Sequence, residues 1–179
     1  MIKIIAQIIG IVAMIFNIFS YQCKNKRLLI LMQFCGASLF CINYFLLGAY
    51  VGGMLNVLSV LRAAVFLAKD KLRAEHIAWQ IGFGICFFVV YGLSFTVLGT
   101  QASAFNLITE LLPVIAMVLA TIGYRLKNAA AIRKISIFAS PMWLIYNSIV
   151  GSIGGIICES FALVSIIVGI IRHDIKKAE

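Results

Sequence analysis

The chain has 179 residues, of which 63% are hydrophobic and 12% are charged, and its mean hydropathy is +1.08. This composition excludes a water-soluble domain, because too few polar residues remain to cover a core of this size. The formal net charge of +9 does not indicate nucleic-acid binding, since no aromatic and basic binding motif accompanies it. We therefore expect an all-α polytopic membrane protein.

Seven apolar segments are long enough to cross a hydrocarbon core of about 30 Å, which takes roughly 17 to 25 helical residues. They are 4–21, 28–47, 51–68, 76–98, 104–124, 131–149 and 153–171. Each is expected to be a helix, because in lipid every backbone N–H and C=O must be satisfied within its own segment. The first segment contains Gln7 and Asn17 and lacks a small-residue cleavage site, so we interpret it as a retained helix.

Lysine and arginine follow an alternating pattern along the connections. The connections after the first, third, fifth and seventh segments are basic, and those after the second, fourth and sixth contain no lysine or arginine. Basic connections stay in the cytoplasm, so this pattern predicts the N-terminus outside and the C-terminus inside. The cytoplasmic face is then expected to meet anionic lipids.

The sequence contains an internal repeat. At an offset of 103 residues, AMIFNIFSYQCKN (13–25) aligns with AMVLATIGYRLKN (116–128), and five positions are identical. At an offset of 102, Tyr44 aligns with Tyr146, and Gly52 and Gly53 align with Gly154 and Gly155. For the third helix of the repeat, two alignments that differ by one residue are therefore both possible.

The repeat predicts three parts of the chain. These are a first three-helix repeat (1–75), a linker helix (76–103) and a second three-helix repeat with a basic cytoplasmic tail (104–179). One linker helix after three spans returns the second copy to the same orientation, so the copies should be parallel (3+1+3). Their seam could hold a site near the midplane. The alternative is that duplication built only a stable bundle.

Two levels of resemblance follow from these residues. The 3+1+3 arrangement, with Tyr44, Gly48, Gly52 and Asn56 near the junction of the second and third helices, resembles the SWEET, SemiSWEET and PQ-loop transporters. Segments 20–27, 43–66 and 140–155 resemble the bacterial YgjV-type inner membrane protein family over nearly the whole chain. The resemblance implies a helical fold in the bacterial inner membrane, and a transport role only by fold-level analogy.

The sequence departs from the PQ-loop pattern at one motif. Where those transporters carry Pro-Gln, this chain has Tyr21-Gln22 in one copy and Tyr124-Arg125 in the other. Proline weakens the hydrogen bonding of a helix and lets it bend. Its absence argues against a SWEET-like rocking motion at these positions.

Arg62 stands in the apolar stretch NVLSVLRAAVF (56–66). At 1.5 Å per residue it lies about 16 Å from the start of its segment, near mid-depth. On a helical wheel it shares one stripe with Gly52, Asn56 and Ser59. Its side chain could snorkel to the cytoplasmic headgroups, but side chains lean toward the helix N-terminus, which is the outer side here.

Two glutamates are also expected inside the membrane. Glu110 aligns with Gln7, and Glu159 takes the place of Asn56 at the offset of 103. A buried charge costs at least about 3 kcal/mol, so Arg62 should meet a carboxylate, water or a ligand. Two interpretations stay open, a polar cavity between the repeats and a fixed salt bridge that locks them together.

The cavity interpretation predicts a substrate-binding set. Its members are Arg62, Glu159, Glu110, Asn56, Asn17 and Asn106, with Trp143, Asn147 and Asn43 as weaker candidates near helix ends. Arg62 would suit an anionic or zwitterionic solute, and protonation of Glu110 or Glu159 could couple uptake to the proton gradient. The leading hypothesis is a small-solute transporter, and the alternative is a non-transporting structural or accessory membrane protein.

Motifs for other chemistry are not found. The sequence has no glycine-rich phosphate loop, no HExxH and no GxSxG, and its acidic residues are too few and too scattered for a metal site. The five cysteines are single and mostly apolar in context, so we expect packing roles. An intramembrane enzyme is disfavoured because no nucleophile has a nearby base. No cofactor or metal is expected, and the oligomeric state, a homo-oligomer included, stays open.

Overall fold

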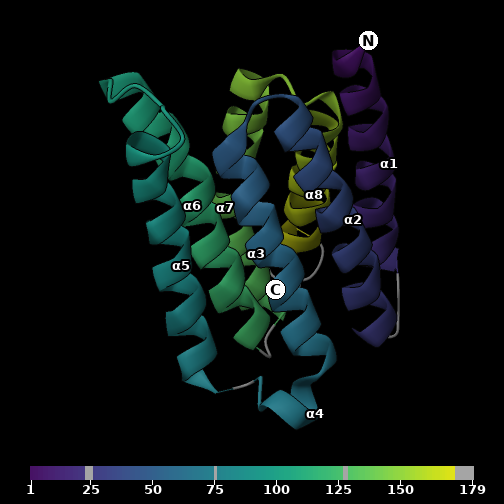
Figure 1. Cartoon of the computed structure of the whole chain (residues 1–179). Coiled ribbons are helices and arrows are strands. Elements are labelled where there is room, and N and C mark those ends of the chain that lie inside the picture. The colour runs from purple at the N-terminus through teal and green to yellow at the C-terminus, as the bar shows by residue number, and fades with distance from the viewer. Residues whose placement is uncertain (23–25, 75, 127–128, 172–179) are drawn as a thin grey trace.

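The computed structural model describes residues 1–22, 26–74, 76–126 and 129–171, and every regular element in these ranges is a helix (Figure 1). The helices are α1 (Ile2–Gln22), α2 (Lys26–Leu46), α3 (Tyr50–Leu67), α4 (Lys69–Leu72), α5 (Ile77–Thr96), α6 (Ala104–Arg125), α7 (Ala129–Val150) and α8 (Ile153–Ile170). The long helices match the predicted segments, with small differences at their ends. The sequence does not predict α4, because one helical turn leaves no signal in a hydropathy pattern.

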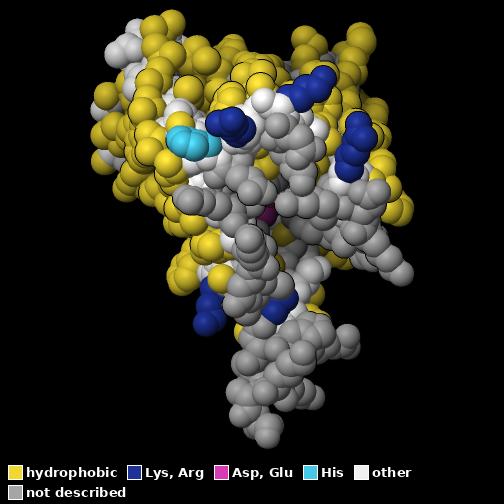
Figure 2. All heavy atoms as spheres, turned by 90° about the horizontal axis from the view of Figure 1, so that it is seen from below, with side chains coloured by type: hydrophobic (Ala, Val, Ile, Leu, Met, Phe, Trp, Pro, Cys, Tyr) yellow, Lys and Arg dark blue, Asp and Glu magenta, His cyan; other side chains and the backbone are white. Residues whose placement is uncertain are grey.

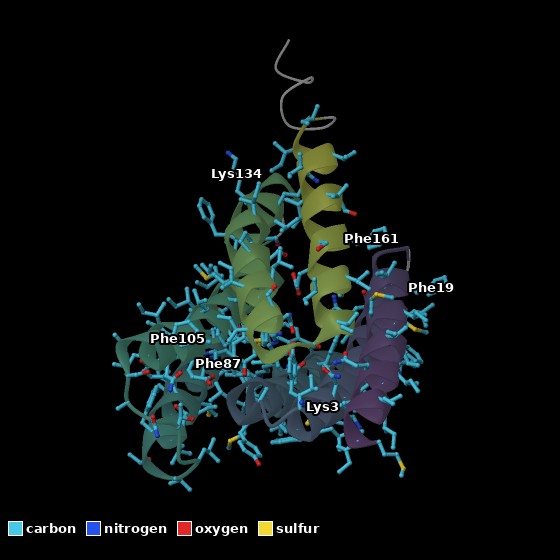
Figure 3. The ribbon with its side chains drawn as sticks, turned by 90° about the horizontal axis from the view of Figure 1, so that it is seen from above. Lys3, Phe19, Phe87, Phe105, Lys134 and Phe161 are labelled. Carbon is cyan, nitrogen blue, oxygen red and sulfur yellow. The ribbon has the colours of Figure 1, made fainter. Side chains whose placement is uncertain are left out.

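The outer surface of the described helices is apolar, as a lipid environment requires. Five helices, α1, α3, α5, α6 and α8, are long and apolar enough to cross a membrane, and α2 contains the shorter apolar stretch Ile30–Leu46. Phe19, Phe105 and Phe161 point away from the bundle, with exposed fractions of 61%, 63% and 57%, whereas Phe87 is fully buried (Figure 3). The exposed phenylalanines lie on three different helices, so the apolar surface surrounds the bundle.

Six long helices pack as a closed ring. In order, α1 packs on α2, α2 on α3, α3 on α6, α6 on α7, α7 on α8, and α8 again on α1. The helix α5 lies beside the ring and packs on α3 and α6 (Figure 1). One apolar cluster, which includes Leu55, Phe87 and Val114, fills the junction of α3, α5 and α6. A second, which includes Ala13, Phe40 and Cys158, joins α1, α2 and α8.

The turn from α2 to α3 and the turn from α7 to α8 share two backbone features. Gly48 and Gly151 have φ angles of 76° and 73°, in the left-handed region that glycine adopts at helix ends. The next N–H groups, of Ala49 and Ser152, donate to carbonyl groups five residues earlier at 2.9 and 3.0 Å. Corresponding residues of the two turns are 103 apart, so this offset relates them rather than 102.

Basic side chains gather at one end of the molecule. Arg27, Lys71, Arg73 and Lys134 are exposed, and Figure 2 shows lysine and arginine side chains around the end that carries α4. Lys3 is in the first turn of α1, which begins at the end opposite α4 (Figure 1). The charge asymmetry predicted along the chain is therefore present between the two ends of the bundle.

Candidate functional site

Three aromatic side chains contact one another in the interior of the helix bundle. The centroid of the Tyr44 ring lies 6.1 Å from that of Trp143 and 6.0 Å from that of Tyr146, and the Trp143 and Tyr146 centroids are 5.8 Å apart. Tyr44 comes from α2 and the other two rings from α7, so the cluster joins the two halves of the chain. Tyr44 and Tyr146 belong to the second apolar cluster, and Trp143 packs against both clusters and so connects them.

The hydroxyl groups of the two tyrosines form hydrogen bonds between the first half of the chain (α1–α3) and the second half (α6–α8). The Tyr44 hydroxyl donates to Asn147 Oδ1 at 2.7 Å, and the Tyr146 hydroxyl accepts a hydrogen bond from the Gly52 N–H at 2.9 Å. Both tyrosines and Asn147 are almost completely buried. A buried hydroxyl or amide without a partner destabilises the fold, so these pairs hold the halves in one relative position.

A further set of contacts joins α1 and α2 to the α7–α8 turn. Asn43 Nδ2 donates to the Ala6 carbonyl at 2.7 Å, and the Ser152 hydroxyl donates to Asn43 Oδ1 at 2.8 Å. A Cβ atom built on Gly154 would lie 2.2 Å from the Gly10 backbone, so α1 and α8 meet backbone to backbone. Only glycine allows this approach.

Arg62 is buried, with an exposed fraction of 5%. Its Nη1 donates to Thr121 Oγ1 on α6 at 2.6 Å, and its Nη2 donates to Ser59 Oγ on α3 at 3.0 Å. The Thr121 hydroxyl in turn donates to the Met117 carbonyl at 2.8 Å. The guanidinium group therefore lies in the α3–α6 junction and contacts hydroxyl groups. The predicted ion pair with Glu159 or Glu110 stays a prediction.

The two glutamates lie near different members of the aromatic cluster. Glu159, partly buried on α8, hydrogen-bonds to Ser140 of α7 and is within electrostatic reach of Tyr44. Glu110, partly buried on α6, is within electrostatic reach of Tyr146. Its Oε2 atom is buried and has no hydrogen-bond partner among the described residues.

The predicted asparagines have separate environments. Asn56 Nδ2 donates to the Gly52 carbonyl of its own helix at 2.9 Å, next to the Tyr146 contact. Asn17 lies against Gly36 of α2, where an added Cβ would come within 2.9 Å of its amide nitrogen. Asn106 Nδ2 donates to the Gln101 carbonyl at 2.9 Å, in the connection before α6. The structure thus brings Trp143, Asn147 and the two glutamates to the aromatic cluster, but not Asn106 or Asn17.

The sequence prediction missed four residues of this region. They are Tyr44, Tyr146, Ser140 and Thr121. Tyr44 and Tyr146 align at an offset of 102, but the turns follow an offset of 103, at which Tyr44 corresponds to Asn147, so the alignment gave no sound signal for this pair. Ser140 and Thr121 had none, since small hydroxyl residues are common in transmembrane helices as packing residues.

The arrangement offers several groups that can bind a small polar molecule. It combines one guanidinium group, two carboxyl groups, two phenol groups and an indole within a membrane-sized bundle. Among the described residues, no group of three or more His, Cys, Asp and Glu side chains could hold a metal ion. Charged and aromatic side chains of this kind can hold a small polar molecule through hydrogen bonds and ring contacts.

Comparison with known proteins identifies the family. The model of a family described as a bacterial inner membrane protein (Imp-YgjV) matches residues 4–177 of this chain. The inner membrane protein YgjV of Escherichia coli strain K12 is 26% identical over 162 residues, which cover 90% of this chain and 80% of that protein. No solved structure matches the chain significantly. With its apolar helices, the chain therefore belongs to the YgjV family of multi-pass proteins of the bacterial inner membrane.

Proposed function

We propose that this chain is a small-solute transporter of the inner membrane, with an anionic or zwitterionic solute. The observation that carries the proposal is the set of polar side chains that both halves direct into the helix junctions: Arg62 from α3, Tyr44 from α2, and Glu110, Tyr146 and Glu159 from the second half. Ionisable groups within transmembrane helices are costly, and they are typical of solute and proton pathways.

The duplicated 3+1+3 arrangement is part of this proposal. Two features support it: the matching turns after α2 and α7, and the pattern of junctions, in which α3 meets α6 as α8 meets α1. If α1, α2 and α3 are taken to correspond to α6, α7 and α8, the α3–α6 junction corresponds to the α8–α1 junction. A seam of this kind between two parallel repeats is where such folds bind their solutes.

We also propose that the basic end of the bundle faces the cytoplasm, where it contacts anionic lipids. The exposed Arg27, Lys71, Arg73 and Lys134 support this orientation. An acidic side chain is visible near the middle of the same face (Figure 2). A carboxyl group that can be approached from the cytoplasmic end fits a path for a solute or a proton.

Arg62 would make the site selective for a solute with a negatively charged group. A guanidinium group presents several N–H donors in one plane and suits a carboxylate or phosphate better than an ammonium group does. Its contacts include the neutral hydroxyl oxygens of Thr121 and Ser59, which an anionic solute could replace. Glu110 and Glu159 are the groups through which transport could be coupled to protons.

Uptake into proteoliposomes tests the proposal. The purified protein is reconstituted and screened with radiolabelled amino acids and short carboxylic acids, with and without an inward proton gradient. We expect uptake of at least one zwitterionic or anionic solute, reduced about tenfold or more by Arg62→Ala, which corresponds to about 1.4 kcal/mol. Arg62→Lys should be reduced less, and Lys134→Ala, which removes an exposed charge, should match the wild type. Absence of any uptake, or equal uptake by Arg62→Ala, would contradict the proposal.

The second candidate is a non-transporting structural or accessory membrane protein with a buried salt bridge. The observation that favours it is the number of buried hydrogen bonds between the halves, including Tyr44 with Asn147 and Asn43 with Ser152. In that case Arg62→Ala should lower the unfolding free energy, and a second change, Glu159→Gln, should recover part of the loss.

A further inference from the structure

Gln7 binds the α7–α8 turn through both the nitrogen and the oxygen of its side-chain amide group. Its Nε2 donates to the Gly151 carbonyl at 2.8 Å, and its Oε1 accepts from the Ile153 N–H at 3.0 Å. The turn therefore needs one donor and one acceptor from α1. An amide supplies both at once.

The other junction of the helix ring has the counterpart of this turn, between α2 and α3, and the counterpart of this helix face, on α6, but that face carries a different residue. The residue that corresponds to Gln7 at the offset of 103 is Glu110. Ala6 and Ala13 of α1 are buried, and so are their counterparts Thr109 and Ala116 of α6. The two helices therefore turn matching faces inward, so Glu110 faces the region that corresponds to the α7–α8 turn. The matching groups there are the Gly48 carbonyl and the Tyr50 N–H.

Glu110 lies near that turn without bonding to it. It is within electrostatic reach of Tyr146, whose hydroxyl accepts from the Gly52 N–H in the first turn of α3. Its Oε2 atom is buried and lacks a hydrogen-bond partner in the described part of the chain. The start of α3 is capped differently from that of α8: its N-cap, Ala49, offers no side-chain acceptor, and the Tyr146 hydroxyl takes the role that the Ser152 hydroxyl has for the Gly155 N–H.

The protonation state of Glu110 decides whether it can make the contacts of Gln7. An ionised carboxyl group only accepts hydrogen bonds, so it could meet the Tyr50 N–H but would be repelled by the Gly48 carbonyl oxygen. A protonated carboxyl group has one donor and one acceptor, as the amide group of Gln7 does in its contacts with the other turn. The side chains of Glu110 and Gln7 also have the same length, since each places its terminal group two CH₂ groups from the backbone.

We propose that Glu110 is a proton-dependent counterpart of Gln7, which closes on the α2–α3 turn when its carboxyl group is protonated. This inference rests on the duplicated arrangement and gives the proton coupling of the proposed function a defined element. Gln7 holds one turn at every pH, and Glu110 holds the other only after it binds a proton. The two junctions of the helix ring are thus chemically distinct although their backbones match.

The surroundings of Glu110 allow such a change. From α7 it faces the Tyr146 hydroxyl, and from α5 the Tyr91 hydroxyl donates to the Leu107 carbonyl, one turn away along α6. The charged group on α3 is Arg62, which contacts α6 at Thr121, about 16 Å along the helix from Glu110. Pro113 lies inside α6 and has no N–H, so the Thr109 carbonyl lacks its helical partner beside Glu110. This turn of α6 can therefore adjust more easily than the rest of the helix.

Hydrogen exchange of the turns tests the proposal. The protein is placed in lipid nanodiscs, and exchange is followed by mass spectrometry in segments 47–53 and 150–156 at about pH 5 and about pH 9, which bracket the range where buried carboxyl groups titrate. All variants are compared at the same pH, so intrinsic exchange rates cancel. Segment 47–53 of the wild type should exchange about tenfold more slowly than that of Glu110→Ala at the low pH, and equally at the high pH.

Three variants serve as controls. Glu110→Gln should protect segment 47–53 at both pH values, and the reciprocal Gln7→Glu should make segment 150–156 lose protection at the high pH. Glu159→Gln, which removes the other carboxyl group, should leave segment 47–53 as in the wild type. The proposal is overturned if Glu110→Gln and Glu110→Ala exchange alike at both pH values, or if the wild type stays protected at the high pH. Exchange is measured without a solute, so the result does not depend on whether the protein transports one.

Discussion

The hydrogen bond between Tyr44 and Asn147 is the clearest single link between the two halves. Its donor and acceptor lie 2.7 Å apart and both residues are buried, so water cannot replace either partner. Hydrogen bonds between transmembrane helices contribute less than their burial suggests, about 0.6 kcal/mol on average and up to about 1.7 kcal/mol. This pair should lie at the upper end of that range, because the Tyr44 ring is also fixed by Trp143 and Tyr146.

A double-mutant cycle measures this link. Tyr44→Phe and Asn147→Leu should each lower the unfolding free energy by about 1 to 2 kcal/mol, because each leaves one buried polar group without its partner. The double variant should be less unstable than the sum of the two changes, with a coupling energy of about 1 kcal/mol. Equilibrium unfolding in mixed detergent micelles gives these values. Tyr44→Phe combined with Ser160→Ala, whose hydroxyl bonds within its own helix, should be additive.

At the scale of the elements, the junction of α1 and α8 depends on glycine. Gly10 and Gly154 bring the two backbones together, and the α3–α6 junction has the larger Pro113 and Val51 at the corresponding positions. The helix α5 packs on α3 and α6 and adds apolar contacts there. One junction is therefore held by direct backbone contact, and the other is supported by a third helix.

Gly154→Ala should disrupt the α1–α8 junction. The added Cβ would lie 2.2 Å from the carbonyl carbon and oxygen of Gly10, so the helices must move apart and the contacts of Gln7 and Asn43 would weaken. We expect a loss of at least about 2 kcal/mol of unfolding free energy. The matched control is Gly82→Ala on α5, where an added Cβ meets nothing within 4 Å. That change should be neutral or should stabilise the helix by up to about 1 kcal/mol. Equal thermal shifts for the two variants would contradict the packing described here.

The helices could be predicted closely from the sequence, and the contacts between them could not. Hydropathy and length limit where a chain can cross lipid, which is why all long helices end near their predicted bounds. The direction of a polar side chain depends instead on how helices cross. Asn106 was expected in a cavity, but its amide group bonds to Gln101 in the preceding connection. The sequence does not distinguish Tyr146 from other aromatic residues of the helices, whereas in the structure its hydroxyl accepts a hydrogen bond from Gly52 at the start of α3.

At the scale of the whole molecule, the two ends of the bundle differ in charge and in how they are closed. Backbone contacts and the hydrogen bonds of Gln7, Asn43 and Ser152 hold the end that carries the α7–α8 turn. The opposite end carries α4 and the exposed basic side chains. If the basic end faces the cytoplasm, as proposed, the α7–α8 turn and its contacts face the outside, and the transport proposal then expects a solute or proton to reach the glutamates from within the cell.

Labelling of single cysteines in spheroplasts tests this orientation. In a background with the five native cysteines replaced by alanine, Tyr50→Cys lies at the start of α3, where the native side chain is 49% exposed, and Leu72→Cys lies on α4, where the native side chain is 43% exposed. A membrane-impermeant maleimide should label Tyr50→Cys in spheroplasts and label Leu72→Cys only after the membrane is opened. The reason is that lysine and arginine beside α4 resist transfer across the membrane during insertion. The reverse pattern would place the basic end outside, and the path proposed from the cytoplasm to Glu110 and Glu159 would be lost with it.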